Sequence, residues 1–182
     1  MLGLISEEIG TLNWNQDLAD ESLLNYQDAL RNYTIINDAL GMSYSLRNIG
    51  RYYLSVYNNS DSAYVYYQRA LSVAHTYNCN SELSILQELG VFYRLKKDYK
   101  KTEYYLLQAL NLDKDTSLFS EIYLSLGYTY LLMDNNEEAD KYLKKATEVS
   151  NVYTQVDAYR LLFELEKLRK NPWVAIEYKE KA

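Results

Sequence analysis

The chain has very few of the residues that break helices or shape tight turns. Its 182 residues include one proline and six glycines, whereas all-β domains use such residues at regular intervals between short strands. No stretch alternates strictly between apolar and polar residues, as a half-buried strand would. Hydrophobic residues make up 48% of the chain, which is enough for a packed core and argues against disorder. The composition therefore predicts an all-α protein.

Cysteine is also scarce, and long apolar runs are absent from the sequence. The single cysteine, Cys79, excludes a disulfide within the chain, which fits a reducing compartment without requiring one. No apolar run approaches the roughly 18–20 residues that cross a bilayer, so we expect no membrane insertion by this segment. The start of the chain turns acidic at Glu7 and Glu8 and lacks the basic residues of a signal peptide. A cytoplasmic location is the default interpretation, and the periplasmic portion of a membrane-anchored protein is the alternative.

An excess of basic side chains is missing too. Residues 1–90 contain four basic and ten acidic side chains, and residues 91–182 contain fifteen of each. Neither half therefore offers the basic surface that a nucleic-acid backbone requires, and we expect no nucleic-acid partner. The net charge of −6 bears mainly on solubility.

The sequence contains no constellation that would carry out catalysis. A phosphate-binding loop, a zinc-protease helix, a nucleophile elbow and a dinucleotide-binding fingerprint are all absent. The only histidine, His75, lies close in sequence to Cys79, but two ligands do not make a zinc site. We therefore expect no enzyme activity, no cofactor and no bound metal.

What the sequence does contain is a recurring dipeptide, an aliphatic residue followed by glycine. It occurs as Ile9-Gly10, Ile49-Gly50, Leu89-Gly90 and Leu126-Gly127, at spacings of 40, 40 and 37 residues. Self-similarity with a period of about 20–50 residues is typical of a helical repeat array. Around the glycines, apolar residues recur at i, i+3, i+4 and i+7, as they do on one face of a helix.

After each glycine comes a polar turn and then a second helix with its own small and large apolar residues. In the second, third and fourth units these residues are Ala63, Tyr67 and Ala70; Thr102, Leu106 and Ala109; and Ala139, Leu143 and Ala146. The whole pattern resembles the tetratricopeptide repeat, and the resemblance covers nearly the entire chain. It is weaker in the first unit, where Asn13 replaces the expected tyrosine, and in the last, where Phe163 stands in place of glycine.

The resemblance implies an all-α, right-handed α-solenoid of about five helix-turn-helix repeats, with about nine or ten helices and no strand. We expect a single array over residues 1–182, with units near 3–38, 43–79, 83–117, 120–152 and 156–182. Because Ala182 falls inside a second helix, we expect the chain to be a fragment of a longer protein. In this respect it resembles the repeat region of larger bacterial repeat proteins.

The repeated glycines predict close helix packing. A glycine in a helix interior costs about 1 kcal/mol relative to alanine, so four of them in register imply a compensating contact. We expect Gly50, Gly90 and Gly127 to be buried where a neighbouring helix approaches too closely for a side chain.

Tyrosines and polar turn residues complete the predicted packing. The tyrosines expected on core stripes are Tyr53, Tyr67, Tyr93 and Tyr130, and one tyrosine of each adjacent pair should lie nearer solvent. Asp61 and Asp98 are placed to cap second helices, and Asn171 is placed to cap the last helix, with Pro172 just inside it.

Repeats of this kind build a binding surface, and the resemblance implies a non-catalytic protein–protein interaction scaffold. In the family, the first helix of each hairpin lines a concave groove that holds a peptide or a helix of a partner. Carried over by helix face, the predicted groove residues are Tyr44, Arg47, Arg51, Leu54, Gln87, Val91, Arg94, Leu95, Leu124, Tyr128 and Leu131. The alternative function is a sensory or regulatory input domain of a larger bacterial signalling protein.

Arginines in this groove suggest the chemistry of the partner. Arg47 and Arg51 lie four residues apart on one helix, and Arg94 lies on the matching face of the next repeat. Their guanidinium groups could converge on an acidic or C-terminal segment, which arginine binds in two-pronged fashion. The alternative is that they pair with Glu88, Glu121 or other groups of the stack and bind no partner. Self-association through the uncapped C-terminal repeat is a further option.

Overall fold

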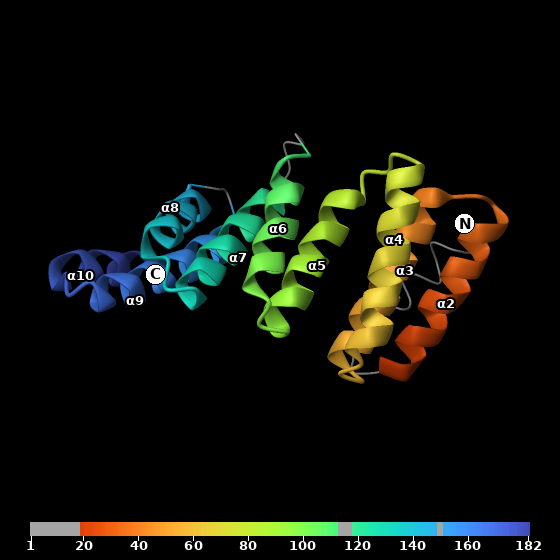
Figure 1. Cartoon of the computed structure of the whole chain (residues 1–182), viewed down its shortest axis with the longest axis horizontal. Helices are drawn as coiled ribbons and strands as arrows, with labels where there is room; N and C mark the ends of the chain where they lie inside the picture. The colour runs from red at the N-terminus through yellow and green to blue at the C-terminus, as the bar shows by residue number, and fades with distance from the viewer. Residues whose placement is uncertain (1–18, 113–117, 149–150) are drawn as a thin grey trace. The chain divides into compact units, whose positions relative to one another are not determined.

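The structure is a computed structural model, and it describes residues 19–112, 118–148 and 151–182. Within these ranges the chain forms nine α-helices and no strand (Figure 1). They are α2 (Ala19–Ile35), α3 (Ala39–Ser55), α4 (Ser60–Thr76), α5 (Glu82–Leu95), α6 (Tyr99–Leu110), α7 (Leu118–Leu132), α8 (Asn136–Thr147), α9 (Val152–Leu168) and α10 (Pro172–Lys181). The predicted all-α fold of paired helices is confirmed. Gly10 and Asn13 of the first predicted unit lie outside the described residues.

The chain divides into two compact units, Met1–Phe92 and Tyr93–Ala182, and each is described by itself. In the first unit, α3 packs against both α2 and α4. Tyr52 of α3 is fully buried, and its hydroxyl donates a hydrogen bond to Asp20 Oδ1 of α2 at 2.5 Å. Burial, and secondly the Asp20 carboxylate, raise the pKa of the Tyr52 hydroxyl above its ordinary value. A buried tyrosine with its hydroxyl satisfied thus joins two helices.

The second unit, Tyr93–Ala182, contains the last residues of α5 and the helices α6 to α10. Here α7 packs against α6, α8 and α9, and α9 packs against α8 and α10. Its fully buried large side chains include Leu106, Ile122, Leu126, Leu143 and Leu162. Leu106 and Leu143 are 37 residues apart and Leu126 and Leu162 are 36 apart, which is the repeat spacing, so the core of this unit runs from one hairpin to the next.

The glycines lie where helices of one hairpin touch. A Cβ atom added at Gly50 would lie 2.9 Å from the ring of Tyr67 and 3.2 Å from the Ala63 carbonyl oxygen on α4. At Gly127 it would lie 2.6 Å from Leu143 Cδ2 on α8. Real Cβ atoms do not approach that closely, so the helices could not pack this way around any larger residue. Gly90 is buried as well, and the predicted burial of these three glycines is confirmed.

The connections between helices turn through residues with a positive φ angle. Six such residues occur in the described ranges, namely Asn37, Asn58, Asn78, Lys97, Asp134 and Lys170. Four of them are asparagine or aspartate, which tolerate this conformation better than other side chains. The fifth and sixth are lysines, and the φ of Lys97 is 61°. The tight turns are therefore obtained without glycine, and at the two lysines they carry backbone strain.

Two of the predicted helix caps need correction. Asp98 accepts from the amide of Lys101 at 3.2 Å, as expected. The α4 cap, however, is Asn59, whose side chain accepts from the Ser62 amide, and Asp61 lies inside the first turn. Asn171 occupies the N-cap position of α10 without capping it through its side chain. Asp61 is not the cap because α4 already begins at Ser60. The Asn171 side chain instead donates from Nδ2 to Glu166 Oε2 at 2.8 Å.

The tyrosine pattern also differs from the prediction at Tyr53 and Tyr93. Tyr93 is half-buried, and the neighbouring Phe92 takes the core position of α5. Tyr67 and Tyr130 are buried as expected, but Tyr53 is only half-buried and stacks on Tyr66 of α4 at 5.5 Å between ring centroids. Its neighbour Tyr52 takes the core position, as Phe92 does in α5, and the Asp20 carboxylate satisfies its hydroxyl. Adjacent residues of a helix are rotated by about 100° about its axis. Tyr52 and Tyr53 therefore point to different neighbouring helices.

Substitution of Gly50 by leucine should lower the free energy of unfolding by about 1–3 kcal/mol or more, because the new side chain must displace Tyr67 and the α4 backbone. The measurement is urea denaturation followed by circular dichroism. Ser72→Leu, at an exposed position of α4, is the matched control and should change stability by about 0.5 kcal/mol or less. Equal effects of the two substitutions would contradict the close approach.

Lys97→Gly should stabilise the protein by about 1 kcal/mol, because glycine adopts the positive φ angle of this turn without the steric cost of a Cβ atom. The neighbouring Lys96→Gly removes the same charge at a turn position without a positive φ. It should therefore give no gain. A melting temperature that rises for neither variant, or equally for both, would argue against strain at Lys97.

Candidate functional site

The residues predicted to line the groove lie on the first helices of successive hairpins. In the first unit they are Tyr44, Arg47, Arg51 and Leu54 of α3 together with Gln87 and Val91 of α5. All six are half-buried. They therefore combine contact with their own unit and access to solvent, as residues of a binding surface do.

The two arginines of α3 are engaged inside the first unit. Arg47 Nη1 donates to Ser84 Oγ at 3.0 Å, and its guanidinium carbon lies 5.1 Å from the centre of the Tyr44 ring. Arg51 Nη1 lies 3.9 Å from Glu88 Oε1, a part-exposed pair. Such pairs hold α3 against α5, and they leave these guanidinium groups less available to a partner.

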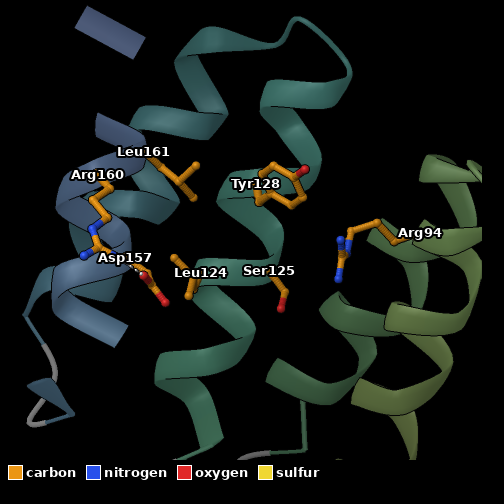
Figure 2. Close-up of a pocket in the computed structure, with 7 residues that line it drawn as sticks. All are labelled: Arg94, Leu124, Ser125, Tyr128, Asp157, Arg160 and Leu161. Atoms are coloured by element: carbon orange, nitrogen blue, oxygen red, sulfur yellow. Dashed lines mark hydrogen bonds and ion pairs between the residues drawn. The ribbon is translucent and has the colours of Figure 1, made fainter. Parts of the chain in front are cut away.

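In the second unit, a pocket of about 380 Å³ opens on the first helices. It is lined by Arg94, Leu124, Ser125, Tyr128, Asp157, Arg160 and Leu161. Figure 2 shows Arg94 reaching from α5 toward α7, which supplies the middle of the wall, while the last three residues come from α9. Three of the lining residues, Arg94, Leu124 and Tyr128, belong to the predicted groove.

The pocket has an apolar wall and polar edges. Leu124 and Leu161 supply aliphatic surface from α7 and α9. The guanidinium carbon of Arg94 lies 5.3 Å from the centre of the Tyr128 ring, which is a favourable cation–π distance. The Nε atom of Arg94 is buried and has no hydrogen-bond partner among the described residues. A buried donor without a partner is costly, so a movement of the Arg94 side chain that brought this nitrogen to an acceptor in the pocket would be favourable.

The α9 edge of the pocket carries both charges. Arg160 Nη1 lies 3.3 Å from Asp157 Oδ1, and the two side chains are 68% and 55% exposed. Pairs this exposed contribute little to stability and exchange partners easily. Arg160 can therefore turn from Asp157 to a ligand carboxylate, whereas Arg94 is held by the Tyr128 ring.

The sequence did not single out Ser125 or the three α9 residues of the pocket. The signal was nevertheless present: in the register that aligns Leu126 with Leu162, Arg160 matches Leu124 and Leu161 matches Ser125. The prediction ended at α7 because Phe163 replaces the repeat glycine and weakens the pattern. Of the other predicted residues, Leu95 is 60% exposed at the end of α5 and Leu131 is half-buried on α7.

The described residues offer no arrangement for metal chemistry. No group of three or more histidine, cysteine, aspartate or glutamate side chains gathers in these parts of the chain so as to hold an ion. His75 is 82% exposed and lies 3.7 Å from Glu82 Oε1, and Cys79 is half-buried. Among the helices of residues 19–112, 118–148 and 151–182, none is long and apolar enough to span a bilayer.

Comparison with known proteins identifies the repeat. Residues 120–153 match the tetratricopeptide repeat family. No curated protein sequence matches the chain at a significant level.

Solved structures show the same fold over almost all of the chain. BtubC from P. vanneervenii is 15% identical, with a TM-score of 0.85, and the match covers 99% of this chain and 79% of that one. PilF of Pseudomonas aeruginosa is 16% identical, with a TM-score of 0.81 and coverage of 99% and 74%. MamA from Desulfovibrio magneticus RS-1, a fragment beginning at its residue 41, is 14% identical, with a TM-score of 0.71 and coverage of 98% and 92%. The chain therefore contains a tetratricopeptide repeat at residues 120–153, and its paired helices share the fold of these solved structures.

Proposed function

We propose that the chain is a non-catalytic protein–protein interaction scaffold that binds a peptide or helix of a partner along its first helices. The pocket of the second unit is the anchor of this interaction. The proposal rests on one observation above all, the buried Nε of Arg94, which has no hydrogen-bond partner among the described residues and lies beside an apolar wall.

The size of the pocket limits what it can hold. Pockets for small ligands measure about 300–1,000 Å³, and this one, at about 380 Å³, lies near the lower limit. It accommodates one or two side chains of a peptide, and the rest of the peptide would lie along the surface. Leu124 and Leu161 favour a large apolar side chain, which would gain about 25 cal/mol for each Å² of apolar surface removed from water.

The charges that line the pocket indicate a second feature of the partner, after the large apolar side chain. Arg94 and Arg160 border the pocket from opposite helices, and Asp157 is the single acidic side chain of its lining. A carboxylate in the pocket would receive hydrogen bonds from Arg94, and it could displace Asp157 from Arg160. Hydrogen bonds of this charge-assisted kind are stronger than neutral ones. The preferred partner segment is therefore acidic, with a large apolar residue beside the carboxylate.

Selection of peptides from a random library on the immobilised chain should enrich sequences that combine an acidic and a large apolar residue. Arg94→Gln should weaken the binding of the enriched peptides about 10-fold or more, because a charge-assisted hydrogen bond contributes about 1.5–3 kcal/mol. Isothermal titration calorimetry measures the loss.

The matched control is Arg69→Gln. Arg69 is an exposed arginine on α4, the second helix of its hairpin, and its guanidinium carbon lies 5.4 Å from the centre of the Tyr66 ring. It therefore shares the residue type and the aromatic contact of Arg94 but does not lie on a first helix. Its substitution should leave affinity unchanged. Leu161→Asp, which places a charge on the apolar wall of the pocket, should also weaken binding. The proposal fails if no peptide is enriched, or if the enriched peptides bind wild type, Arg94→Gln and Leu161→Asp equally well.

A further inference from the structure

Three successive hairpins contain a pair of tyrosines whose rings stack on each other. The first tyrosine of each pair stands three residues after the repeat glycine, and the second stands three residues after the small residue of the second helix. The repeat register therefore brings two phenol rings into contact in one hairpin after another. The stacked pairs are Tyr53 with Tyr66, Tyr93 with Tyr105, and Tyr130 with Tyr142, and their ring centroids are 5.5, 5.3 and 5.5 Å apart.

The two rings of each pair are also nearly parallel. The angles between the ring planes are 10°, 6° and 17° in chain order. Stacking of this kind contributes to the packing of a hairpin. It also places the two rings where oxidation could couple them, since groups that are already held together react far faster than groups that must first meet.

Exposure to solvent separates the pairs. Tyr130 and Tyr142 are only 5% and 8% exposed, and the Tyr130 hydroxyl donates to Glu103 Oε1 at 2.5 Å. This pair is shielded from an oxidant that acts at the surface. Tyr93 and Tyr105 are both half-buried, so solvent reaches part of each ring while the fold still holds them.

Residues of α6 fix the geometry of this accessible pair. Lys101 Nζ lies 4.8 Å from the centre of the Tyr93 ring, which is a favourable cation–π distance. The ring of Tyr104 meets the Tyr105 ring edge-on, with the centroids 5.2 Å apart and 77° between the planes. Tyr104 itself is 56% exposed. The stacked rings are therefore supported by their neighbours and lie next to solvent.

We propose that Tyr93 and Tyr105 are a modification site, at which a haem peroxidase that consumes hydrogen peroxide joins the two rings into dityrosine. The bond ties the end of α5 to α6. The same reaction is open to Tyr53 and Tyr66, which are half-buried as well.

The reaction balances without any group from the chain other than the two phenols. The oxidant removes one electron and the phenolic proton from each tyrosine, and the two phenoxyl radicals form one carbon–carbon bond between ring carbons next to the hydroxyl groups. The hydrogen on each of these carbons then moves to the oxygen, which restores both aromatic rings. One hydrogen peroxide accepts the two electrons and two protons and leaves as two waters. The linked chain is therefore two hydrogen atoms lighter.

The bond would have the structural effect of a disulfide. The chain has a single cysteine and 21 tyrosines, so a covalent tie within it must use other side chains than cysteine. A link between residues 93 and 105 closes a short loop around the turn of the α5–α6 hairpin and restricts the unfolded chain, as short disulfide loops do. The bond uses none of the residues that line the pocket.

Peroxidase and limiting hydrogen peroxide, added to the 182-residue chain at about 1 µM, test the proposal. Two tethered groups meet at an effective concentration of about 1 mM or more, so coupling within the hairpin outruns coupling between chains. Trypsin cleaves after Arg94 and Lys101, which places Tyr93 and Tyr105 on separate peptides. We expect mass spectrometry to find these two peptides linked, with a mass two hydrogens below their sum.

Tyr93→Phe and, separately, Tyr105→Phe should abolish the linked peptide, because phenylalanine keeps the ring but forms no phenoxyl radical. The matched control is Tyr104→Phe: Tyr104 lies on the same peptide and contacts Tyr105 edge-on. Its substitution should leave the link in place. Unchanged circular dichroism verifies the fold of all three variants.

Three results would overturn the proposal. The first is a wild-type chain without the linked peptide. The second is a link that survives Tyr105→Phe and is lost in Tyr104→Phe, since exposure and not stacking would then select the site. The third is cross-linking spread over the most exposed tyrosines, such as Tyr57 and Tyr153 at 55% and 86%, or found mainly between chains.

Discussion

The fold depends on the close approach of two helices at a position without a side chain. In α3 and α7 a glycine faces a large residue of the following helix, Tyr67 in one hairpin and Leu143 in the other. The large side chain fills the space that a Cβ atom would need, and it is fully buried there. Helix stability decreases by about 1 kcal/mol at each glycine, and the tight packing of the hairpin offsets this cost.

The close packing within each hairpin determines which residues of its helices can contact the next hairpin. Because the small residues of second helices face inward, the next position along the helix points to the following hairpin, as Tyr64, Glu103 and Asp140 do. These contacts vary in chemistry from ring stacking to an ion pair, whereas the small residue beside them stays small. The first helices have a further face that these packing contacts leave open. In the second unit, residues on this face of α5, α7 and α9 line the pocket (Figure 2).

The sequence predicted the helices and the buried glycines because both follow from periodicity, which a repeated chain shows several times. It was less successful where two neighbouring residues compete for one place. Tyr52 and Tyr53 differ by one helical step, and the packing places Tyr52, whose hydroxyl donates to Asp20 32 residues away, in the core. The sequence likewise predicted Asp61 as the cap of α4, whereas the structure has Asn59 there. The helix begins directly after the turn at Asn58, which has a positive φ angle.

The candidate site was predictable only in part. The register of the first helices gave Arg94, Leu124 and Tyr128, but the contribution of α9 was missed since Phe163 interrupts the glycine pattern there. The pairing of Arg51 with Glu88 was one of two alternatives that the sequence left open. Side-chain partners between hairpins depend on three-dimensional distances, and the repeat spacing does not encode them.

The dependence of the fold on glycine and its large partner is tested most directly by a double-mutant cycle between Gly127 and Leu143, with denaturation measured for Gly127→Leu, Leu143→Ala and the combined variant. If the two positions share one space, the combined variant should be more stable than the sum of the single effects allows, by about 1 kcal/mol or more. Effects that add to within about 0.5 kcal/mol would show that the two residues do not compete for this space, and would contradict the account.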